Sequence, residues 1–408
     1  MLKKYNCNMK NKKILISGAS IAGPTLAYWL HRYGFTVTVV ERAPELRLGG
    51  QNIDVKGPAK EVALKMGIVE KIRARNTTEV GLRFVDSQNE TLAEFPSDSS
   101  MSMTQELEIL RGDLVKILYE QSSKDVNYIF GDHIVHLKET EDDIGVEFKS
   151  GKKEAFSIVI SAEGIGSATR DLAFGSRPHY KYLGLHTAYL TIPKKSTDSR
   201  WARWYNAPRG IVFMLRPDNY GENRASVTFL AKENEYKDLP EDRQKKVLIS
   251  HLNGTGWESE RLINEIEDSK DFYFERVSQV KAKQWSKGRV VITGDAAWCA
   301  TPIAGKGTDL AMAGAYVLAG ELSKAEDHYE AFKNYEKIMR PYVDKCQKLP
   351  PGIPGIVYPE SKWGVTLLNK VVKIAGSKPV KYVMNLFSGT EKEDKKDFVL
   401  PNYENNFK

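Results

Sequence analysis

The sequence of 408 residues contains only three cysteines, Cys7, Cys299 and Cys346. Their spacing suits neither a zinc site nor a disulfide framework, so we expect no metal ligation and a reducing, cytoplasmic compartment. No stretch approaches about 18 uninterrupted apolar residues, so no membrane-spanning helix is expected. Arginine blocks and basic-aromatic alternation are also missing. The net charge of +7 therefore does not point to nucleic acid.

Internal repeats and low-complexity blocks are absent as well. What remains is the composition of a soluble globular protein, with 41% hydrophobic and 28% charged residues. A chain of this length can bury a large core and form more than one substructure.

The most informative stretch is a short apolar run over residues 14–16 that leads into the closely spaced Gly18, Ser20 and Gly23. An apolar helical pattern follows at once, and then a second strand that ends at Glu41. In such a unit the three small residues permit a sharp turn, let the backbone approach a pyrophosphate and let helix and strand pack closely. The helix N-terminus faces the phosphates, and Glu41 is placed for a ribose. This context favours a dinucleotide site over an ordinary parallel strand-helix pair.

The segment after this unit carries Arg47, Gly49, Gly50 and Asp54. Glycines beside charged residues suit a loop that lies against a ligand, and a solvated surface turn is the alternative. Arg111 directly precedes a helical pattern and could hold a phosphate or ribose. Taken alone, Arg111 fits a surface arginine better than a ligand contact.

Two later stretches repeat the combination of a buried strand, an acidic residue and glycine. The second is followed by a helix rich in small residues, which could lie against a flat ligand or another helix. The first stretch ends in Glu163-Gly164; the second is Gly294-Asp295, followed by Pro302, Gly305, Gly307 and Thr308.

Between these stretches, the pattern from about residue 174 to 280 is that of successive strands with one helix, which predicts a mostly antiparallel sheet inserted into the nucleotide-binding fold. The expected boundaries are 12–79, 105–175 and 281–345 for the nucleotide-binding domain, 80–104 and 176–280 for the substrate domain, 346–389 for a C-terminal capping segment, and 1–11 and 390–408 for flexible tails.

The three motifs, at Gly18, at Glu163-Gly164 and at Gly294-Asp295, follow one another in this order along the chain. In this they resemble the FAD-dependent aromatic hydroxylases, the single-component monooxygenases related to para-hydroxybenzoate hydroxylase, over residues 12–345. The sequence is most similar to the tetracycline-inactivating monooxygenases, through Gly49-Gly50-x-x-x-Asp54 and Arg111-x-Asp-Leu and through a short C-terminal helix in place of a thioredoxin-like domain. The resemblance implies an α/β fold: a Rossmann-like FAD-binding domain, an inserted mostly antiparallel β-sheet substrate domain and a C-terminal helix.

The resemblance also implies roles for single residues. Glu41 and Arg42 would hold the adenosine ribose, and Arg111 the pyrophosphate or ribose region. Asp295 would hold the ribityl chain. The other expected ligands are Gly18, Ser20, Ile21, Ala22, Gly23, Gly164, Gly294, Pro302, Gly305, Gly307 and Thr308 for FAD, Asp54 near the substrate side of FAD, and Arg47 for the nicotinamide dinucleotide. The sequence departs from the family at Glu163, where Asp is usual, and at Thr308-Asp309, where a hydrophobic-Asn pair is common.

The chemistry implied is that NADPH reduces FAD, which forms a C4a-hydroperoxide with O2 and hydroxylates an aromatic or polyketide-like small molecule, with tetracyclines as possible substrates. Catalysis is centred on the flavin, so no catalytic side chains are expected. A reductase or halogenase of the same fold, or a flavin- or ligand-binding protein without turnover, is the alternative. We expect a monomer without nucleic-acid partners or stable membrane insertion.

Candidate substrate residues come from strands of the inserted sheet. Alternate residues of a strand point to opposite sides, so half of the set is expected to fill the core instead. The set is Arg203, Tyr205, Phe213, Arg216 and Thr228. The amphipathic segment 363–387 is predicted to cap the substrate entrance. A membrane-surface helix is the rival interpretation, favoured by Lys370, Lys373, Lys378 and Lys381.

Overall fold

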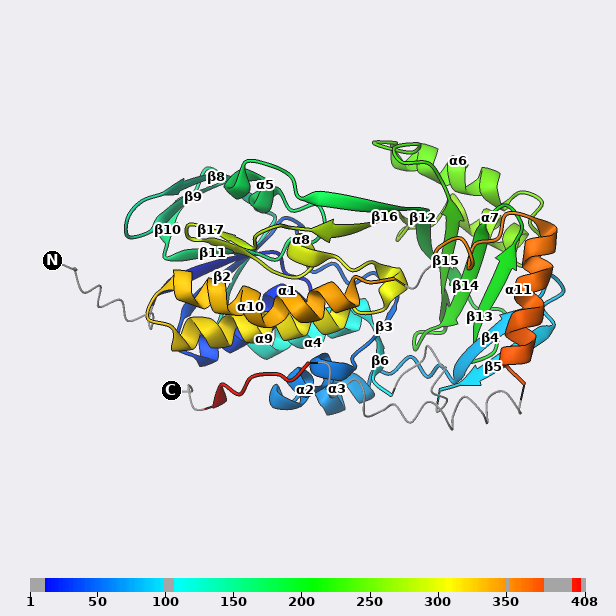
Figure 1. Ribbon diagram of the computed structural model, residues 1–408, viewed down its shortest axis with the longest axis horizontal. Coiled ribbons are helices and arrows are strands. Elements are labelled where there is room, and N and C mark those ends of the chain that lie inside the picture. Colours follow the sequence, from blue (N-terminus) through cyan, green and yellow to red (C-terminus); the bar gives the residue numbers. More distant parts are fainter. Residues whose placement is uncertain (1–11, 98–105, 350–351, 378–397, 405–408) are drawn as a thin grey trace.

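The computed structural model describes residues 12–97, 106–349, 352–377 and 398–404. Two β-sheets dominate it, one largely parallel and one largely antiparallel, and they lie at opposite ends of the long axis (Figure 1). We call the two ends the parallel half and the antiparallel half. The predicted α/β fold with an inserted antiparallel sheet and a C-terminal helix is confirmed.

The sheet of the parallel half has six strands in the order β17-β18-β11-β1-β2-β7, and only β17 runs antiparallel to its neighbour. Its central strands are apolar on both faces because both faces are covered. The strands are β1 (Lys13–Ser17), β2 (Thr36–Glu41), β7 (Asn127–Phe130), β11 (Ile158–Ser161), β17 (Ser286–Lys287) and β18 (Val290–Ile292).

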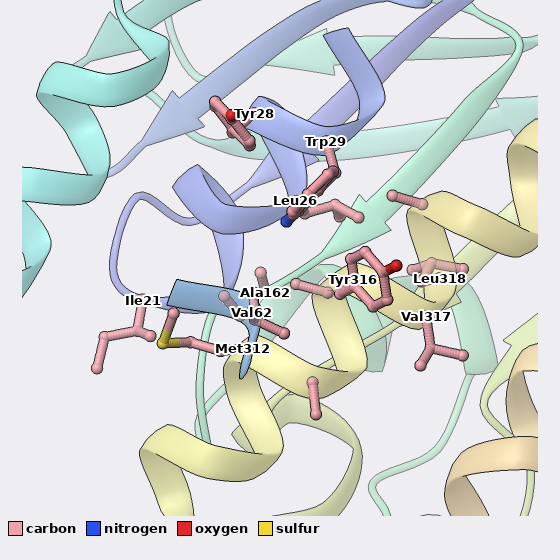
Figure 2. Close-up of a cluster of buried hydrophobic side chains, with 14 of the residues drawn as sticks. Ile21, Leu26, Tyr28, Trp29, Val62, Ala162, Met312, Tyr316, Val317 and Leu318 are labelled. Carbon is pink, nitrogen blue, oxygen red and sulfur yellow. The ribbon is translucent and has the colours of Figure 1, made fainter. Parts of the chain in front are cut away.

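Helices cover one face of this sheet. Figure 2 shows the contact between α1 and α9, where Trp29 meets the edge of the Tyr316 ring at a centroid distance of 4.9 Å. Ile14 and Ile16 of β1 belong to the same core. The helices of the parallel half are α1 (Ala22–Arg32), α2 (Gly57–Lys65), α3 (Val69–Arg73), α4 (Arg111–Ser122), α8 (Asp295–Trp298), α9 (Gly307–Lys324) and α10 (His328–Cys346), together with α5 (Ala168–Phe174), which lies beside β8 on the other side.

A small antiparallel sheet covers the other face. Leu15 of β1 and Val159 of β11 point to this side and pack with Ile144 and Phe148. The alternation along β1, with Ile14 and Ile16 toward the helices and Leu15 away from them, is the period of two expected for a strand. The small sheet consists of β8 (Ile134–Glu139), β9 (Ile144–Phe148) and β10 (Lys153–Phe156).

The sheet of the antiparallel half has seven strands in the order β16-β12-β15-β14-β13-β4-β5, and β13 and β4 are its one parallel pair. Helices α6 and α7 bury one of its faces. The elements are β4 (Gly81–Val85), β5 (Thr91–Pro96), β12 (His179–Pro193), β13 (Ala202–Ala207), β14 (Ile211–Pro217), β15 (Glu222–Leu230), β16 (Tyr273–Lys281), α6 (Glu241–Leu252) and α7 (Ser259–Ile266).

The long strands β12 and β16 reach from one half to the other (Figure 1). The backbone N–H of Val280 on β16 donates to the Cys299 carbonyl, 3.1 Å away, directly after α8. A two-stranded ribbon of β3 (Asn52–Asp54) and β6 (Glu108–Leu110) forms a second link between the halves. The inserted sheet is therefore fixed to the parallel half at two places.

The C-terminal part of the chain contacts both halves of the molecule. Helix α11 (Lys362–Ala375) lies at the far end of the antiparallel half, against β5 and β13 (Figure 1). Residues 398–404 then lie against α9 and α10 of the parallel half. Tyr403 is only 1% exposed and its hydroxyl donates to Glu321, 2.6 Å away.

This packing corrects the expectation of a flexible tail over 390–408, because residues 398–404 carry apolar side chains that fill a gap beside α9. The other expected tail, residues 1–11, lies outside the described residues. None of the helices in the described parts of the chain is long and apolar enough to cross a lipid bilayer.

Candidate functional site

The glycine turn after β1 is closely packed. Gly18 has φ of 109°, and a Cβ atom there would lie 2.5 Å from the Ala162 carbonyl oxygen. A Cβ at Gly23 would lie 1.9 Å from the Gly18 oxygen. Only glycine fits either position. Helix α1 then starts at Ile21 without a capping side chain or an acidic residue in its first turn. Its first N–H groups are therefore available to a phosphate.

Glu41 closes this turn from the tip of β2. Its carboxylate accepts hydrogen bonds from the backbone N–H of Ala19, at 2.8 Å, and of Ala43, at 3.0 Å. Each carboxylate oxygen keeps a further lone pair, so the group could also accept from ribose hydroxyls. Arg42, the next residue, is exposed at the edge of the turn.

Arg111 brings a cation to the start of α1. Its Nη2 donates to the Ser20 hydroxyl at 2.7 Å, and its Nη1 donates to the Gly49 carbonyl at 3.0 Å. Burial lowers the pKa of Arg111, and the nearby positive charge of Arg47 lowers it further. Two guanidinium groups of like charge beside an uncapped helix N-terminus suit an anionic ligand, which would offset their repulsion.

Asp295 lies at the start of α8, close enough to Arg111 for the two charges to interact. Its side chain is open to solvent, yet the protein that surrounds it raises its pKa to about 6, against the opposing charge of Arg111. We call the region between Asp295, Arg111 and the start of α1 the groove. A Cβ atom at Gly164, Gly305 or Gly307 would meet no atom within 4 Å, so each of these positions leaves open space.

The loop into α9 contains both predicted and unexpected features. Pro302 starts a short 3₁₀ turn and Thr308 lies in the first turn of α9, which has no capping side chain. Asp309 follows, but it accepts from the Ala59 N–H at 3.0 Å and from the Tyr342 hydroxyl. Asp309, where the sequence departs from the family, therefore joins α9 to α2 and α10 through these two hydrogen bonds.

Glu163, the other departure, is also bound within the protein. It accepts from the Ser167 hydroxyl at 2.8 Å and from the Thr169 N–H at 2.9 Å, and Ser17 donates to it as well. Its carboxylate ties the end of β1 to the start of α5.

The structure corrects three of the five expected substrate residues. Phe213 is fully buried among the side chains of α6 and α7, and the Tyr205 hydroxyl donates to the Thr255 carbonyl at 3.0 Å. Arg203 forms a salt bridge with Glu258, 3.0 Å away, on the same side. These residues point away from the parallel half because α6 and α7 need an apolar sheet face to pack on.

The other two, Arg216 and Thr228, lie on the opposite face. The Arg216 guanidinium is buried in salt bridges with Glu79, at 2.8 Å, and with Glu108 of β6. Nearby, burial raises the pKa of Asp54, opposed by the charge of Arg216. Arg216 therefore links the sheet to the β3–β6 ribbon, where its hydrogen bonds are already made within the protein.

The C-terminal segment covers this second face. Asn206 of β13 donates through Nδ2 to the Val357 carbonyl at 2.7 Å. Tyr358 packs on Val212, and its hydroxyl forms a hydrogen bond with Thr228. Residues 352–361 and α11 are thus the outer wall of the space above the sheet.

A family model described as "FAD binding domain" matches residues 11–347. The chain belongs to this FAD-binding-domain family. Among curated relatives, a flavin-dependent monooxygenase from an unknown prokaryotic organism is 38% identical over 338 residues, which are 82% of this chain and 88% of the relative. The flavin-dependent monooxygenase eupH of Phoma sp. is 38% identical over 407 residues, with 92% and 94% covered.

Solved structures agree with this FAD-binding-domain assignment. Tetracycline destructase Tet(55) is 34% identical, with a TM-score of 0.80 and coverage of 96% of this chain and 99% of the other. Klebsiella pneumoniae HpxO in complex with FAD and uric acid, at 19% identity and a TM-score of 0.72, covers 91% of this chain and 95% of its own, and shares the fold. The predicted family and its FAD-binding fold are confirmed.

The residues of this FAD-binding domain suit the cofactor in their chemistry. The uncapped start of α1, Arg111 and Arg47 offer donors and positive charge to a pyrophosphate, and Glu41 and Asp295 offer acceptors to sugar hydroxyls. At the turn after β1, a Cβ atom on Gly18 or Gly23 would collide with the backbone.

Sequence reasoning missed one polar cluster beside the groove. Thr187 and Tyr189 of β12 pair in register with Glu275 and Tyr273 of β16, on the face that also bears Thr228. Glu275 forms hydrogen bonds with both tyrosines. Burial raises its pKa to about 7, and the charge of Asp295 contributes to this rise. Glu275, on this face of the sheet, therefore lies close enough to Asp295 for their charges to interact. The Tyr-x-Glu alternation in β16 was the available signal, but it does not tell which face is buried.

Proposed function

We propose that this protein is a flavin-dependent monooxygenase that uses NADPH and O2 to hydroxylate an aromatic or polyketide-like small molecule, with tetracyclines as the first compounds to test. The observation that carries the proposal is that the polar cluster of Tyr189, Glu275 and Tyr273 on the sheet lies next to Asp295 of the groove. The relatives named flavin-dependent monooxygenases support the reaction, and the destructases Tet(51) and Tet(55), at 33% and 34% identity, support the substrate class.

When bound, FAD supplies hydride transfer from NADPH and the activation of O2, with one oxygen atom passed to the substrate and the other released as water. The chain binds and orients the cofactor. The start of α1, Arg111 and Ser20 hold the pyrophosphate, Glu41 holds the adenosine ribose and Asp295 accepts from the ribityl hydroxyls. Arg47 provides a positive charge for NADPH.

The start of α9 has an electrostatic role in this proposal. Its uncapped N–H groups carry partial positive charge, which favours the negative charge that reduction adds to the cofactor. Asp309 in the first turn would oppose this effect if ionised. Burial raises the pKa of Asp309, while the hydrogen bonds from the Tyr342 hydroxyl and the Ala59 N–H lower it.

The substrate lies in this proposal on the sheet face that bears Thr228, Trp204 and Met214. The register places these side chains on one side of β15, β13 and β14, and Trp204 lies beside Phe84 at 5.7 Å between ring centroids. Such a face offers aromatic contact at one end and the hydroxyl and carboxyl groups of the polar cluster at the other. The wall formed by residues 352–377 excludes water from the reaction.

The test is turnover with a compound panel of tetracyclines, simple phenols and polyketides. Each is incubated with the FAD-loaded protein, NADPH and O2, while NADPH oxidation, oxygen uptake and product mass are followed. A compound that stimulates NADPH oxidation and gains one oxygen atom supports the proposal. A compound that binds tightly without stimulating oxidation or changing mass would instead indicate a ligand-sequestering protein.

A further inference from the structure

Helix α11 has two apolar sides, and within the described parts of the chain only one of them packs against the protein. Val365 is buried toward the sheet, and Gly376, just after the helix, lies against Ala93 of β5. A second row of apolar side chains points outward along the whole length of the helix. These residues are Trp363, Leu367, Val371 and Ile374, with exposed fractions of 74%, 46%, 53% and 62%.

The spacing of four, four and three residues places this row on one line of the helix surface. Single exposed apolar residues are common on protein surfaces, but a continuous row headed by a tryptophan marks a contact surface. We call these four residues the outer stripe.

The charged residues of α11 itself are all basic. Lys362, Lys370 and Lys373 are exposed on α11, and the helix contains no acidic residue. The sequence from 361 to 390 contains five lysines and neither Asp nor Glu, whereas the whole chain has 60 basic and 53 acidic residues. This stretch therefore differs from the rest of the chain in charge as well as in exposed apolar surface.

An apolar stripe flanked by lysines fits the surface of an anionic lipid bilayer. Tryptophan and aliphatic side chains enter the boundary between headgroups and acyl chains, and lysines reach the phosphates beside it. We propose that α11 is a peripheral docking surface for anionic membranes, with the outer stripe in the lipid interface. In a twofold dimer through this surface, the α11 lysines of the two copies would face one another, and their repulsion disfavours such a dimer.

The docking surface lies outside the FAD groove, so the inference does not depend on the proposed function. It does have a geometric consequence. Residues 352–361 and α11 form one wall over the sheet face, so docking would place that wall against the lipid. An apolar compound dissolved in the bilayer would then start close to the sheet.

Vesicle sedimentation of the FAD-loaded protein tests the proposal. We expect binding to vesicles of equal parts phosphatidylcholine and phosphatidylglycerol, and weaker binding to pure phosphatidylcholine or at high salt. Trp363→Ala/Leu367→Ala should weaken binding to both kinds of vesicle. Lys370→Gln/Lys373→Gln should weaken binding to the anionic vesicles alone, by about fivefold per lysine.

Matched controls exist elsewhere on the surface. Leu172 on α5 is as exposed as Leu367, at 46%, and Lys333 and Lys337 are exposed on α10. Leu172→Ala and Lys333→Gln/Lys337→Gln should leave vesicle binding unchanged. Bound-flavin absorbance and melting temperature confirm that each variant is folded.

Three results would overturn the proposal. The first is wild-type protein that stays in the supernatant with anionic vesicles. The second is binding that the stripe variants leave intact, and the third is binding that the control variants reduce equally. Wild-type protein that ignores vesicles but forms a dimer lost in Trp363→Ala would assign the outer stripe to a second copy instead.

Discussion

Two carboxyl groups define the chemistry of the groove at the scale of single residues. Asp295 and Glu275 come from elements on opposite sides of the junction between the two sheets, and the charge of Asp295 makes ionisation of Glu275 less favourable. Arg111 acts in the opposite direction on Asp295. The ionisation of this pair therefore depends on what occupies the groove, and both positions give direct tests.

Asp295→Ala should weaken FAD binding while the protein remains folded. Ribityl hydroxyls that lose their acceptor in a partly buried site cost about 1–3 kcal/mol, roughly a 5- to 150-fold change in the dissociation constant. Fluorescence titration of the FAD-free protein measures this change, with the exposed Asp142→Ala as the control. Unchanged affinity in Asp295→Ala would show that the carboxylate has another role.

Glu275 should make the stability of the FAD-free protein depend on pH. Its pKa is raised from 4.5 to about 7 in the folded state, so the folded state retains a proton that the unfolded state releases. The free energy of unfolding then falls as pH rises through this window and stays reduced above it. Glu275→Gln should make the fall smaller without abolishing it, because burial also raises the pKa of Glu108 to about 7.

Urea denaturation at pH values below, within and above this window measures the difference between wild type and Glu275→Gln. The exposed Glu260→Gln is the control. A pH dependence identical in wild type and Glu275→Gln would mean that Glu275 ionises as freely in the folded protein as in the unfolded one.

At the scale of elements, the wall made by residues 352–361 and α11 is the part whose role was predicted from sequence as a cap. The inward side of α11 rests on β5 at a very close contact. A Cβ atom at Gly376 would lie 2.4 Å from the Ala93 Cβ. The position of the helix relative to the sheet can therefore be disturbed by one added side chain.

Gly376→Val should displace the end of α11 without affecting the FAD groove. Under the proposed function, FAD stays bound, but water reaches the reaction and more NADPH is consumed per molecule of product. The ratio of NADPH oxidised to product formed measures this effect. Trp363→Ala, which changes only the outward side of the same helix, should keep the wild-type ratio. An unchanged ratio in Gly376→Val would leave α11 a structural brace.

At the scale of the whole molecule, stability depends on the salt bridges of Arg216 that link the antiparallel half to the β3–β6 ribbon. Arg216 extends from the antiparallel sheet into a buried site between Glu79 and Glu108, and it also donates to the Asn52 carbonyl at 3.4 Å. Removing this cation takes away the positive charge that balances two buried carboxyl groups. The cost of breaking such a site is about 3–5 kcal/mol.

Arg216→Met should therefore lower the free energy of unfolding by about this amount. Adding Glu79→Gln and Glu108→Gln should restore much of the loss, because the remaining groups are then uncharged. Chemical denaturation of the three variants measures both effects. A loss below about 1 kcal/mol in Arg216→Met would indicate that water replaces the guanidinium at the joint.

The features that could best be predicted from the sequence are those set by residues close together in the chain. The turn at Gly18, the acceptor Glu41 and the strands that lead toward Gly164 and Asp295 are local patterns with one geometric solution. The side of the inserted sheet that faces the groove depends instead on where α6 and α7 pack, so Phe213 could not be told from Thr228. The pairing of Glu275 with Tyr189 joins residues far apart in the chain, and no local pattern reveals it.

Tyr403 shows the same dependence on distant parts of the chain. Its ring fills the space above Gly320, where a Cβ atom would lie 2.2 Å away, and it holds the last described residues on α9, the helix that begins at the groove. A stop codon that falls before position 403 would thus remove a buried partner of α9 although every cofactor motif had already been translated. In the cell, the steady-state level of such a shortened product should fall before its chemistry does, because proteases act on the unfolded fraction. We therefore expect selection to act on the codon for Tyr403 as well as on those of the glycine turn.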